Sequence, residues 1–117
     1  MTSSPAIKRM ITEMKDEKYE TNHFYTIIHN PDDPLKCLAT IQNVPRKGLE
    51  GVVFNLEIVC RATYPFEAPI IRFLGPLDSV PLDHIDADGY LCMDMFEWCP
   101  AWTLRGLVYT ICSVLAD

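Results

Sequence analysis

The stretch of residues 51–60, GVVFNLEIVC, constrains the fold of this chain more than any other part of it. Apolar residues occupy every second position from Phe54 to Ile58, and Asn55 and Glu57 fall between them. Because successive side chains of a strand point to opposite faces, this strand would have one buried face and one face that meets water. That pattern is typical of an antiparallel sheet with a helix packed on one side.

Three further segments have the composition of strands. Residues 24–29, 37–42 and 70–74 are rich in β-branched and aromatic residues and are bounded by turn-forming residues. The connections between the four strands are too short to hold a helical crossover. The sequence therefore predicts a four-stranded antiparallel meander.

A helix is predicted before the first strand. Ser4 can cap it, Pro5 suits its first helical position, and the pattern ends near Lys18. Apolar residues at helical spacing predict a face turned toward the core. These residues are Ile7, Met10, Ile11 and Met14.

A second helix is predicted near the end of the chain, with Thr103 as its cap. Its apolar stripe also predicts a core-facing side. The stripe consists of Leu104, Leu107, Val108, Ile111, Val114 and Leu115. One helix before the sheet and one after it give an α+β fold class.

A chain of 117 residues, 49% of them hydrophobic, is expected to form a single small domain over residues 1–117. The net charge of −6 argues against nucleic acid or an anionic membrane as the main partner. No apolar run approaches the roughly 20 residues that a membrane-spanning helix needs. The five cysteines are odd in number, form no CxxC motif and follow no secretory signal. We therefore expect a reducing compartment, cytoplasmic or nuclear.

Between the last strand and the second helix lies a segment, residues 81–102, in which no periodicity holds. It contains Cys92, with Gly89 before it and Asp94 after it. A loop of this length in a small domain is usually functional. We interpret it as the loop of a nucleophilic cysteine.

Several motifs carry a resemblance to a known family. Residues 64–73, YPFEAPIIRF, resemble the YPFxxPxxxF signature of ubiquitin-conjugating enzymes, and residues 89–94, GYLCMD, resemble the segment that carries their active-site cysteine. Residues 98–101, WCPA, resemble the W-S-P-A that follows, and residues 6–10 and 111–115 are similar to two of the family's helices. The order and rough spacing match over nearly the whole chain.

The resemblance implies the fold and the activity of that family. The fold would have an N-terminal helix, a four-stranded antiparallel meander, a long active-site loop and one following helix, without the C-terminal helices that usually come after Asp117. The activity would be acyl transfer. Cys92 would carry ubiquitin or a related modifier as a thioester, supplied by an activating enzyme that uses ATP, and would pass it to an amine of a protein substrate with the help of a ligase. No bound cofactor and no metal are implied.

The thiol itself has no basic neighbour in the sequence. Asp86, Asp88 and Asp94 would raise the pKa of Cys92 if they lay close to it. The thiolate is the nucleophile, but a carrier that receives an activated acyl group does not require a strongly lowered thiol pKa. This environment suits a carrier better than a protease.

The chain departs from the family at the His-Pro-Asn positions, which hold Leu82, Asp83 and His84. His84 replaces the Asn and is a candidate donor to the oxyanion of the transfer step, or a residue that stabilises a turn. Asp94 is a candidate to orient or deprotonate the incoming amine, or a residue that caps a turn. The spacing from Cys92 to the next motif is also shorter than is common.

These departures suggest a preference among amines. A lysine, with a pKa of about 10.4, is almost wholly protonated at neutral pH, whereas an α-amine, at about 7.7–8.0, is partly neutral. Without the Asn and the acidic loop that usually follows, we expect the site to favour α-amines or thiols, or to need a ligase to complete it.

Partner surfaces follow from the resemblance alone. Lys8 and Arg9 resemble the basic first-helix residues that meet the activating enzyme, although a solvated helix face explains them equally well. The ligase-facing loop tips would hold Phe66, Pro100 and Ala101. The face that contacts the carried modifier would hold Tyr109 and Ser113.

Four alternatives remain open. The chain could accept the modifier but discharge it only onto the cysteine of another protein. The chain could be a non-catalytic adaptor of the same fold that binds ubiquitin or another conjugating enzyme, although such variants typically lack the cysteine that this chain keeps. The residues from His84 to Gly89 resemble a calcium loop, but His84 and Met95 occupy positions where acids are needed. Cys92 and Cys99 with His84 could bind zinc, but no fourth ligand is evident.

Overall fold

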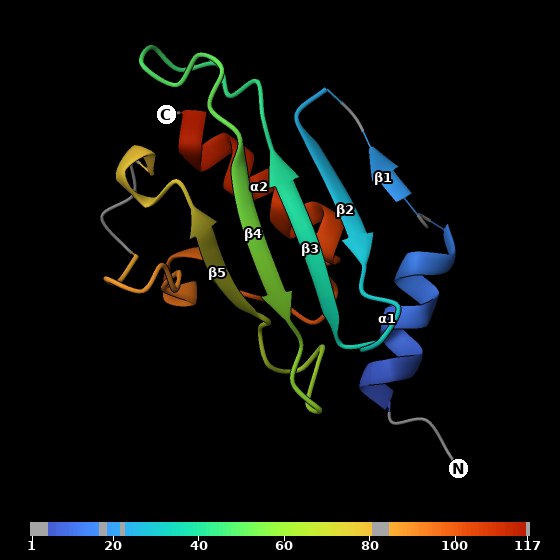
Figure 1. The fold of residues 1–117 in the computed structure, drawn as a ribbon. Coiled ribbons are helices and arrows are strands. Elements are labelled where there is room, and N and C mark those ends of the chain that lie inside the picture. Colours follow the sequence, from blue (N-terminus) through green and yellow to red (C-terminus); the bar gives the residue numbers. More distant parts are fainter. Residues whose placement is uncertain (1–4, 17–18, 22, 81–84, 117) are drawn as a thin grey trace.

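The computed structural model describes residues 5–16, 19–21, 23–80 and 85–116 (Figure 1). Helix α1 (Pro5–Asp16) comes first and helix α2 (Leu104–Ala116) comes last. Between them lie five strands and two short 3-10 helices. The strands are β1 (Tyr19–Thr21), β2 (Tyr25–His29), β3 (Lys36–Ile41), β4 (Phe54–Val59) and β5 (Ile70–Gly75), and the 3-10 helices are η1 (Leu77–Ser79) and η2 (Met93–Phe96).

The strands form one antiparallel sheet in the order β1-β2-β3-β4-β5, so the predicted meander between two helices is confirmed. β1 adds a three-residue strand that the sequence did not predict, because so short a strand shows no alternation. The strand predicted over residues 51–60 begins only at Phe54. The reason is Gly51, whose φ of 74° lies in the left-handed region and outside extended backbone.

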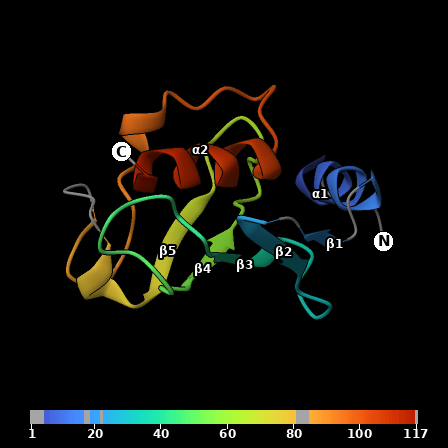
Figure 2. The same cartoon turned by 90° about the horizontal axis from the view of Figure 1, so that it is seen from above.

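The hydrophobic core lies between the sheet and α2, which crosses one face of the sheet (Figure 2). On β4, Phe54 and Ile58 are buried against this helix side and Asn55 is exposed, as the alternation predicted. The stripe predicted for α2 is also confirmed, with Val114 only partly buried. Its buried members are Leu104, Leu107, Val108, Ile111 and Leu115.

Helix α1 lies beside the sheet near β1 and β2, not across its face (Figures 1 and 2). It buries Ala6 and Met10, and the Sγ of Cys60 lies 3.6 Å from the Sδ of Met10. The core face predicted for this helix is wrong at Ile11, which is 50% exposed. A helix at the side of a sheet contacts the core through a narrower stripe than one that crosses it.

The other face of the sheet carries half-exposed apolar side chains. Ile28 on β2 and Leu38 on β3 are register partners across the two strands, and each is about half exposed, as is Leu74 on β5. Both described helices lie elsewhere, α2 on the inner face and α1 at the side. The sheet therefore has one buried face and one face in contact with solvent.

Candidate active site

Cys92 follows directly after a short segment that pairs with β5. The N–H of Phe73 donates to the carbonyl of Gly89 at 2.8 Å, and the N–H of Leu91 donates to the carbonyl of Ile71 at 2.9 Å. Isolated bridges join Arg72 to Tyr90 and Ile85 to Leu91. The backbone on the N-terminal side of the cysteine is thus fixed to the edge of the sheet, where it also covers the unpaired groups of β5.

A tight turn built by Asp86 and Gly89 makes this pairing possible. The Oδ1 of Asp86 accepts hydrogen bonds from the N–H groups of Asp88 and Tyr90 at 2.9 and 3.0 Å. Gly89 has a φ of 93°, and a Cβ there would collide with the carbonyl oxygen of Phe73. The Asp86 carboxylate therefore has a turn-forming role of the kind expected of Asp in a loop.

The thiol of Cys92 is exposed between two buried anchors. Leu91 before it and Phe96 after it are buried, and Cys92 is the N-terminal flanking residue of η2, with extended backbone. Cys99 is the other exposed cysteine. Leu91 and Phe96 thus hold the chain to the core on both sides of Cys92 while its thiol lies at the surface.

The remaining three cysteines are unsuited to nucleophilic chemistry. Burial raises the pKa of Cys37 to about 12 and that of Cys112 to about 11. Burial, with smaller contributions from the Cys37 and Glu13 charges, also raises the pKa of Cys60. Thiols with such pKa values stay protonated at neutral pH, and the thiolate is the reactive form.

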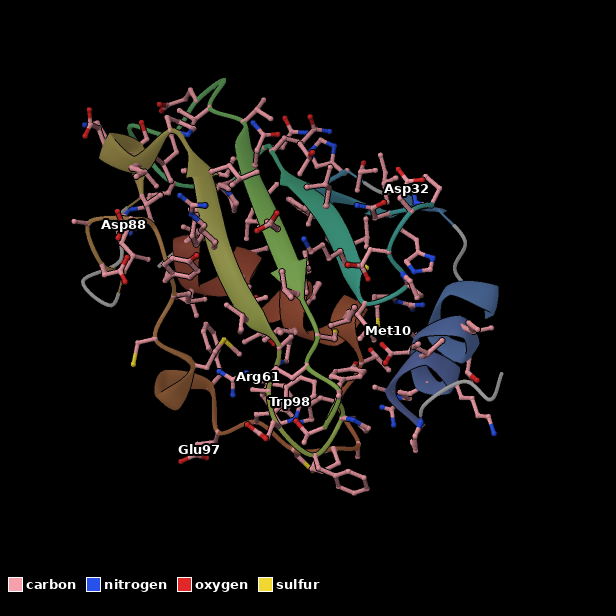
Figure 3. The ribbon with its side chains drawn as sticks, turned by 60° about the horizontal axis from the view of Figure 1, so that its bottom comes forward. Met10, Asp32, Arg61, Asp88, Glu97 and Trp98 are labelled. Carbon is pink, nitrogen blue, oxygen red and sulfur yellow. The ribbon has the colours of Figure 1, made fainter. Side chains whose placement is uncertain are left out.

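The W-C-P-A motif packs against the Y-P-F motif. The indole Nε1–H of Trp98 donates to the carbonyl of Pro65 at 2.7 Å, and its ring lies 5.8 Å from that of Tyr64 and 5.9 Å from that of Trp102. Figure 3 shows Trp98 directed inward, whereas Glu97 points away from the molecule. The two motifs that carry the resemblance therefore form one structural unit.

Arg9 does not lie on a solvated helix face. Its Nη2 donates to the carbonyls of Pro100 and Trp102 at 3.0 and 2.8 Å, and its Nε pairs with Glu13 at 3.0 Å. Lys8, in contrast, is exposed on α1. The two basic residues predicted as one pair thus have different environments.

Sequence reasoning did not identify Glu13 as part of the site. Its side chain is only 7% exposed, and it accepts hydrogen bonds from the hydroxyl of Tyr64 and the backbone N–H of Leu104. The spacing of Arg9 and Glu13, four residues apart on a helix, predicts their ion pair. No pattern in the neighbouring sequence indicates their hydrogen bonds to residues far along the chain.

The predicted ligase-facing residues are exposed at this same junction. Phe66 is 76% exposed, and Pro100 and Ala101 are also exposed. The contacts of Trp98 with Pro65, and of Arg9 with Pro100, bring the two loops that carry them next to α1. The structure thus places these candidates on adjoining segments.

Tyr109 and Ser113 share an exposed face of α2. Tyr109 is 60% exposed, and the Ser113 hydroxyl donates to the Tyr109 carbonyl at 3.2 Å. Both line a shallow hollow of about 160 Å³. The other lining residues are Phe24, Pro45, Cys112 and Ala116.

A larger hollow, of about 400 Å³, adjoins the cysteine segment. Tyr90, Leu91 and Met93 form one side of it, and the ion pair of Arg61 with Glu67, at 2.7 Å, lies on the other. Hydrogen bonds from Thr63 and Arg61 lower the pKa of the exposed Glu67 carboxyl. Most residues that line this hollow thus lie on the loop between β4 and β5 and on the segment around Cys92.

Two candidate catalytic groups stay predictions. His84 lies outside the described residues. Asp94 lies within η2, but its side chain is outside the part that the structure describes. Within the described ranges, His, Cys, Asp and Glu form no group of three or more that could hold a metal ion, and neither helix has the length and apolar character needed to cross a membrane.

Comparisons with known proteins agree with this geometry. The family model described as ubiquitin-conjugating enzyme matches residues 9–117. The solved structure of human ubiquitin-conjugating enzyme E2 G1 is similar in fold, with a TM-score of 0.76 at 20% identity, over 97% of this chain and 94% of that one. A putative ubiquitin conjugating enzyme from Plasmodium yoelii has a TM-score of 0.77 at 25% identity, over 100% of this chain and 76% of that one. The chain belongs to the ubiquitin-conjugating enzyme family.

Proposed function

We propose that this chain is an active conjugating enzyme that carries ubiquitin or a related modifier on Cys92. The observation that supports this most is the exposure of the Cys92 thiol, in the family's cysteine motif, between the buried anchors Leu91 and Phe96. The paired segment before it fixes the backbone from which the thiol projects. This arrangement offers the thiol to a large protein donor.

The proposed cycle has two acyl transfers. The Cys92 thiolate attacks the thioester carbonyl on the activating enzyme, a new carbon–sulfur bond forms, and the activating enzyme's sulfur leaves as a thiolate. A neutral amine then attacks the new thioester, loses a proton, and forms an amide as the Cys92 thiolate leaves. Each step passes through a tetrahedral oxyanion that needs hydrogen-bond donors.

His84 and Asp94 are the proposed helpers of the second step. His84 replaces the family's Asn and would donate to the oxyanion, and Asp94 would orient the amine or take its proton. With these groups in place of the usual ones, we propose that α-amines discharge the thioester faster than lysines unless a ligase completes the site. Equal discharge to free lysine and to an α-amine would contradict this preference.

The exposed candidates are proposed to meet partners. Lys8 would contact the activating enzyme, Phe66 and Pro100 the ligase, and the α2 face with Tyr109 and Ser113 the carried modifier. An exposed aromatic ring and a proline on adjoining loops suit a small, transient interface. The protein would act in the cytoplasm or nucleus, without a bound cofactor, and the ATP is consumed by the activating enzyme.

A charging assay tests the proposal. The chain is mixed with ATP, an activating enzyme and ubiquitin, and the products are compared on reducing and non-reducing gels beside the variants Cys92→Ser and Cys99→Ser. We expect a reducible adduct that Cys92→Ser loses and Cys99→Ser keeps. Because both cysteines are exposed, Cys99→Ser controls for adventitious thiol chemistry.

The absence of an adduct with ubiquitin and its common relatives would favour the adaptor. The half-exposed apolar pair Ile28 and Leu38 on the outer sheet face is the observation that supports this second function. A binding titration with ubiquitin would then decide it.

A further inference from the structure

We propose that Arg9 and Glu13 are positioning residues for Cys92, although neither is near it in the sequence. Together they hold the loop of residues 97–103, which follows the cysteine, against α1. We call this set of contacts the α1 clamp. The inference rests on the proposed function, since it concerns how fast the Cys92 thioester reacts.

The guanidinium group of Arg9 binds the loop backbone directly. One nitrogen, Nη2, donates to two carbonyls, those of Pro100 and Trp102, at 3.0 and 2.8 Å. A charged donor makes hydrogen bonds roughly twice as strong as neutral ones, and the planar guanidinium group fixes their direction. The loop is thus tied to α1 through its main chain, independently of which side chains it carries.

Glu13 uses both carboxylate oxygens, and they bind one residue of its own helix and residues of two other segments. Its Oε2 accepts from Arg9 and from the Tyr64 hydroxyl, and its Oε1 accepts from the N–H of Leu104 at 2.7 Å. Leu104 is the first residue of α2, where the backbone N–H groups lack helical partners and a negative charge is favoured. Glu13 therefore fixes the beginning of α2 and, at the same time, orients Arg9.

Aromatic contacts hold the other side of the loop. Trp98 lies between the rings of Tyr64 and Trp102 and donates to the carbonyl of Pro65. Arg9 lies 6.0 Å from the centre of the Tyr64 ring. The loop of residues 97–103 is consequently bound by α1, by the Y-P-F loop and by its own two indoles.

The consequence for Cys92 comes from what lies on each side of it. Residues 89–91 are bonded to β5, and the α1 clamp holds the chain from Pro100 onward, so that Cys92 and η2 lie between two fixed points. Releasing the clamp would leave the C-terminal end of this span held by Phe96 and by the contacts of Trp98, without the support of α1. Because a displacement of about 1 Å can lower a rate by up to about 10²-fold, we expect the clamp to control the reaction rate at Cys92.

This role differs from that of a partner contact. A residue that meets the activating enzyme needs its charge at the surface, and Lys8 has that exposure. Within the described part of the chain, the hydrogen bonds of Arg9 run to Glu13, Pro100 and Trp102 of the same molecule. The removal of Arg9 should therefore slow discharge to a small amine, a reaction that requires neither the activating enzyme nor a ligase.

The test uses the full chain and two separate readouts. The variants are Arg9→Ala, Arg9→Lys and Glu13→Gln, with Lys47→Ala as a control that removes one positive charge from an exposed loop residue outside the clamp. The first readout is acrylamide quenching of tryptophan fluorescence, since both tryptophans of the chain, Trp98 and Trp102, lie in the clamped loop. The second is single-turnover discharge of the charged protein to a small amine, after the activating enzyme has been stopped.

We expect Arg9→Ala to raise the quenching constant and to lower the maximal discharge rate on the order of 10-fold, with the half-saturating amine concentration unchanged. Glu13→Gln should do the same, and Arg9→Lys should recover part of the rate. Lys47→Ala should match the wild type. A loss of stability alone would lower the melting temperature without changing either readout at a temperature where all variants are folded.

Unchanged quenching in Arg9→Ala would overturn the clamp, and increased quenching with an unchanged discharge rate would overturn its positioning role. If the wild type fails to charge at all, the proposed function fails. The quenching result still decides whether the clamp holds the loop, so the two failures can be told apart.

Discussion

At Gly89 the backbone turns with a φ of 93°, and the carbonyl oxygen of Phe73 lies where a Cβ would reach. The N–H of Phe73 also donates a hydrogen bond to the carbonyl of Gly89. Moving either residue apart to make room for a Cβ would therefore weaken the pairing with β5. The turn before Cys92 thus requires a residue without a Cβ atom at position 89. The sequence motif includes this glycine, but only the structure shows that a side chain here would collide with the Phe73 carbonyl.

Gly89→Ala should therefore destabilise the fold by more than left-handed backbone strain alone, which costs of order 1–3 kcal/mol. Gly48→Ala is the matched control, because Gly48 has a φ of 95° and nothing within 4 Å of its Cβ position. Urea unfolding of both variants isolates the collision as the difference between them. Equal losses would show that the strand edge adapts to the added methyl group.

Reactivity of the cysteines should follow their burial. Iodoacetamide at neutral pH should modify Cys92 and Cys99 in the folded protein and leave Cys37 and Cys60 unmodified until the chain is unfolded, because a buried thiol is both shielded and protonated. Peptide mass spectrometry measures each site. Rapid modification of Cys37 under native conditions would contradict the buried core.

Elements with a regular spacing of hydrophobic residues were predictable from the sequence. Features that depend on very short strands or on tertiary packing were not. The alternation around Phe54 and the stripe on α2 correspond to the buried faces, since burial repeats with the geometry of the element. The three residues of β1 are too few for a period. Ile11 was misplaced because the position of α1 beside the sheet is a tertiary property, invisible in the helix itself.

The cap of α2 was predicted correctly and can be tested. The Thr103 hydroxyl accepts a hydrogen bond from the N–H of Gly106 at 3.1 Å. Thr103→Ala should cost about 0.5–2 kcal/mol, as loss of an N-cap does. Thr110→Ala is the control, since the Thr110 hydroxyl donates back to the Gly106 carbonyl within the helix. Denaturant titration of the two variants should separate them, and equal stability would argue against the cap.

For the whole molecule, the site arises from contacts between distant parts of the chain. Sequence motifs identified Cys92 and the loops around it, because those residues lie close together along the chain. Outside α1, the partners of Arg9 and Glu13 are 51 to 93 residues away along the chain, so no local pattern could indicate them. The predicted helpers His84 and Asp94 stay predictions.

The buried thiols should make global stability fall in alkali. Burial raises the pKa of Cys37 from 9.0 to about 12, so the folded state keeps a proton that the unfolded chain releases. Stability is then fully present below the unfolded pKa and declines as pH rises toward the folded one. Between about pH 8 and about pH 10.5, the melting temperature of Cys37→Ala should fall less steeply than that of the wild type. Parallel curves would show that Cys37 titrates freely in the fold.

The bond between Glu13 and the N–H of Leu104 joins residues 91 positions apart. During synthesis Glu13 leaves the ribosome long before Leu104, and Cys92 also emerges ahead of the helix that completes its surroundings, since the N-terminal part of a chain appears first. Contacts that close so long a loop form late in folding. A nascent polypeptide therefore exposes the Cys92 thiol before the contact between α1 and α2 can form, and the surroundings of this thiol are complete only after α2 has docked.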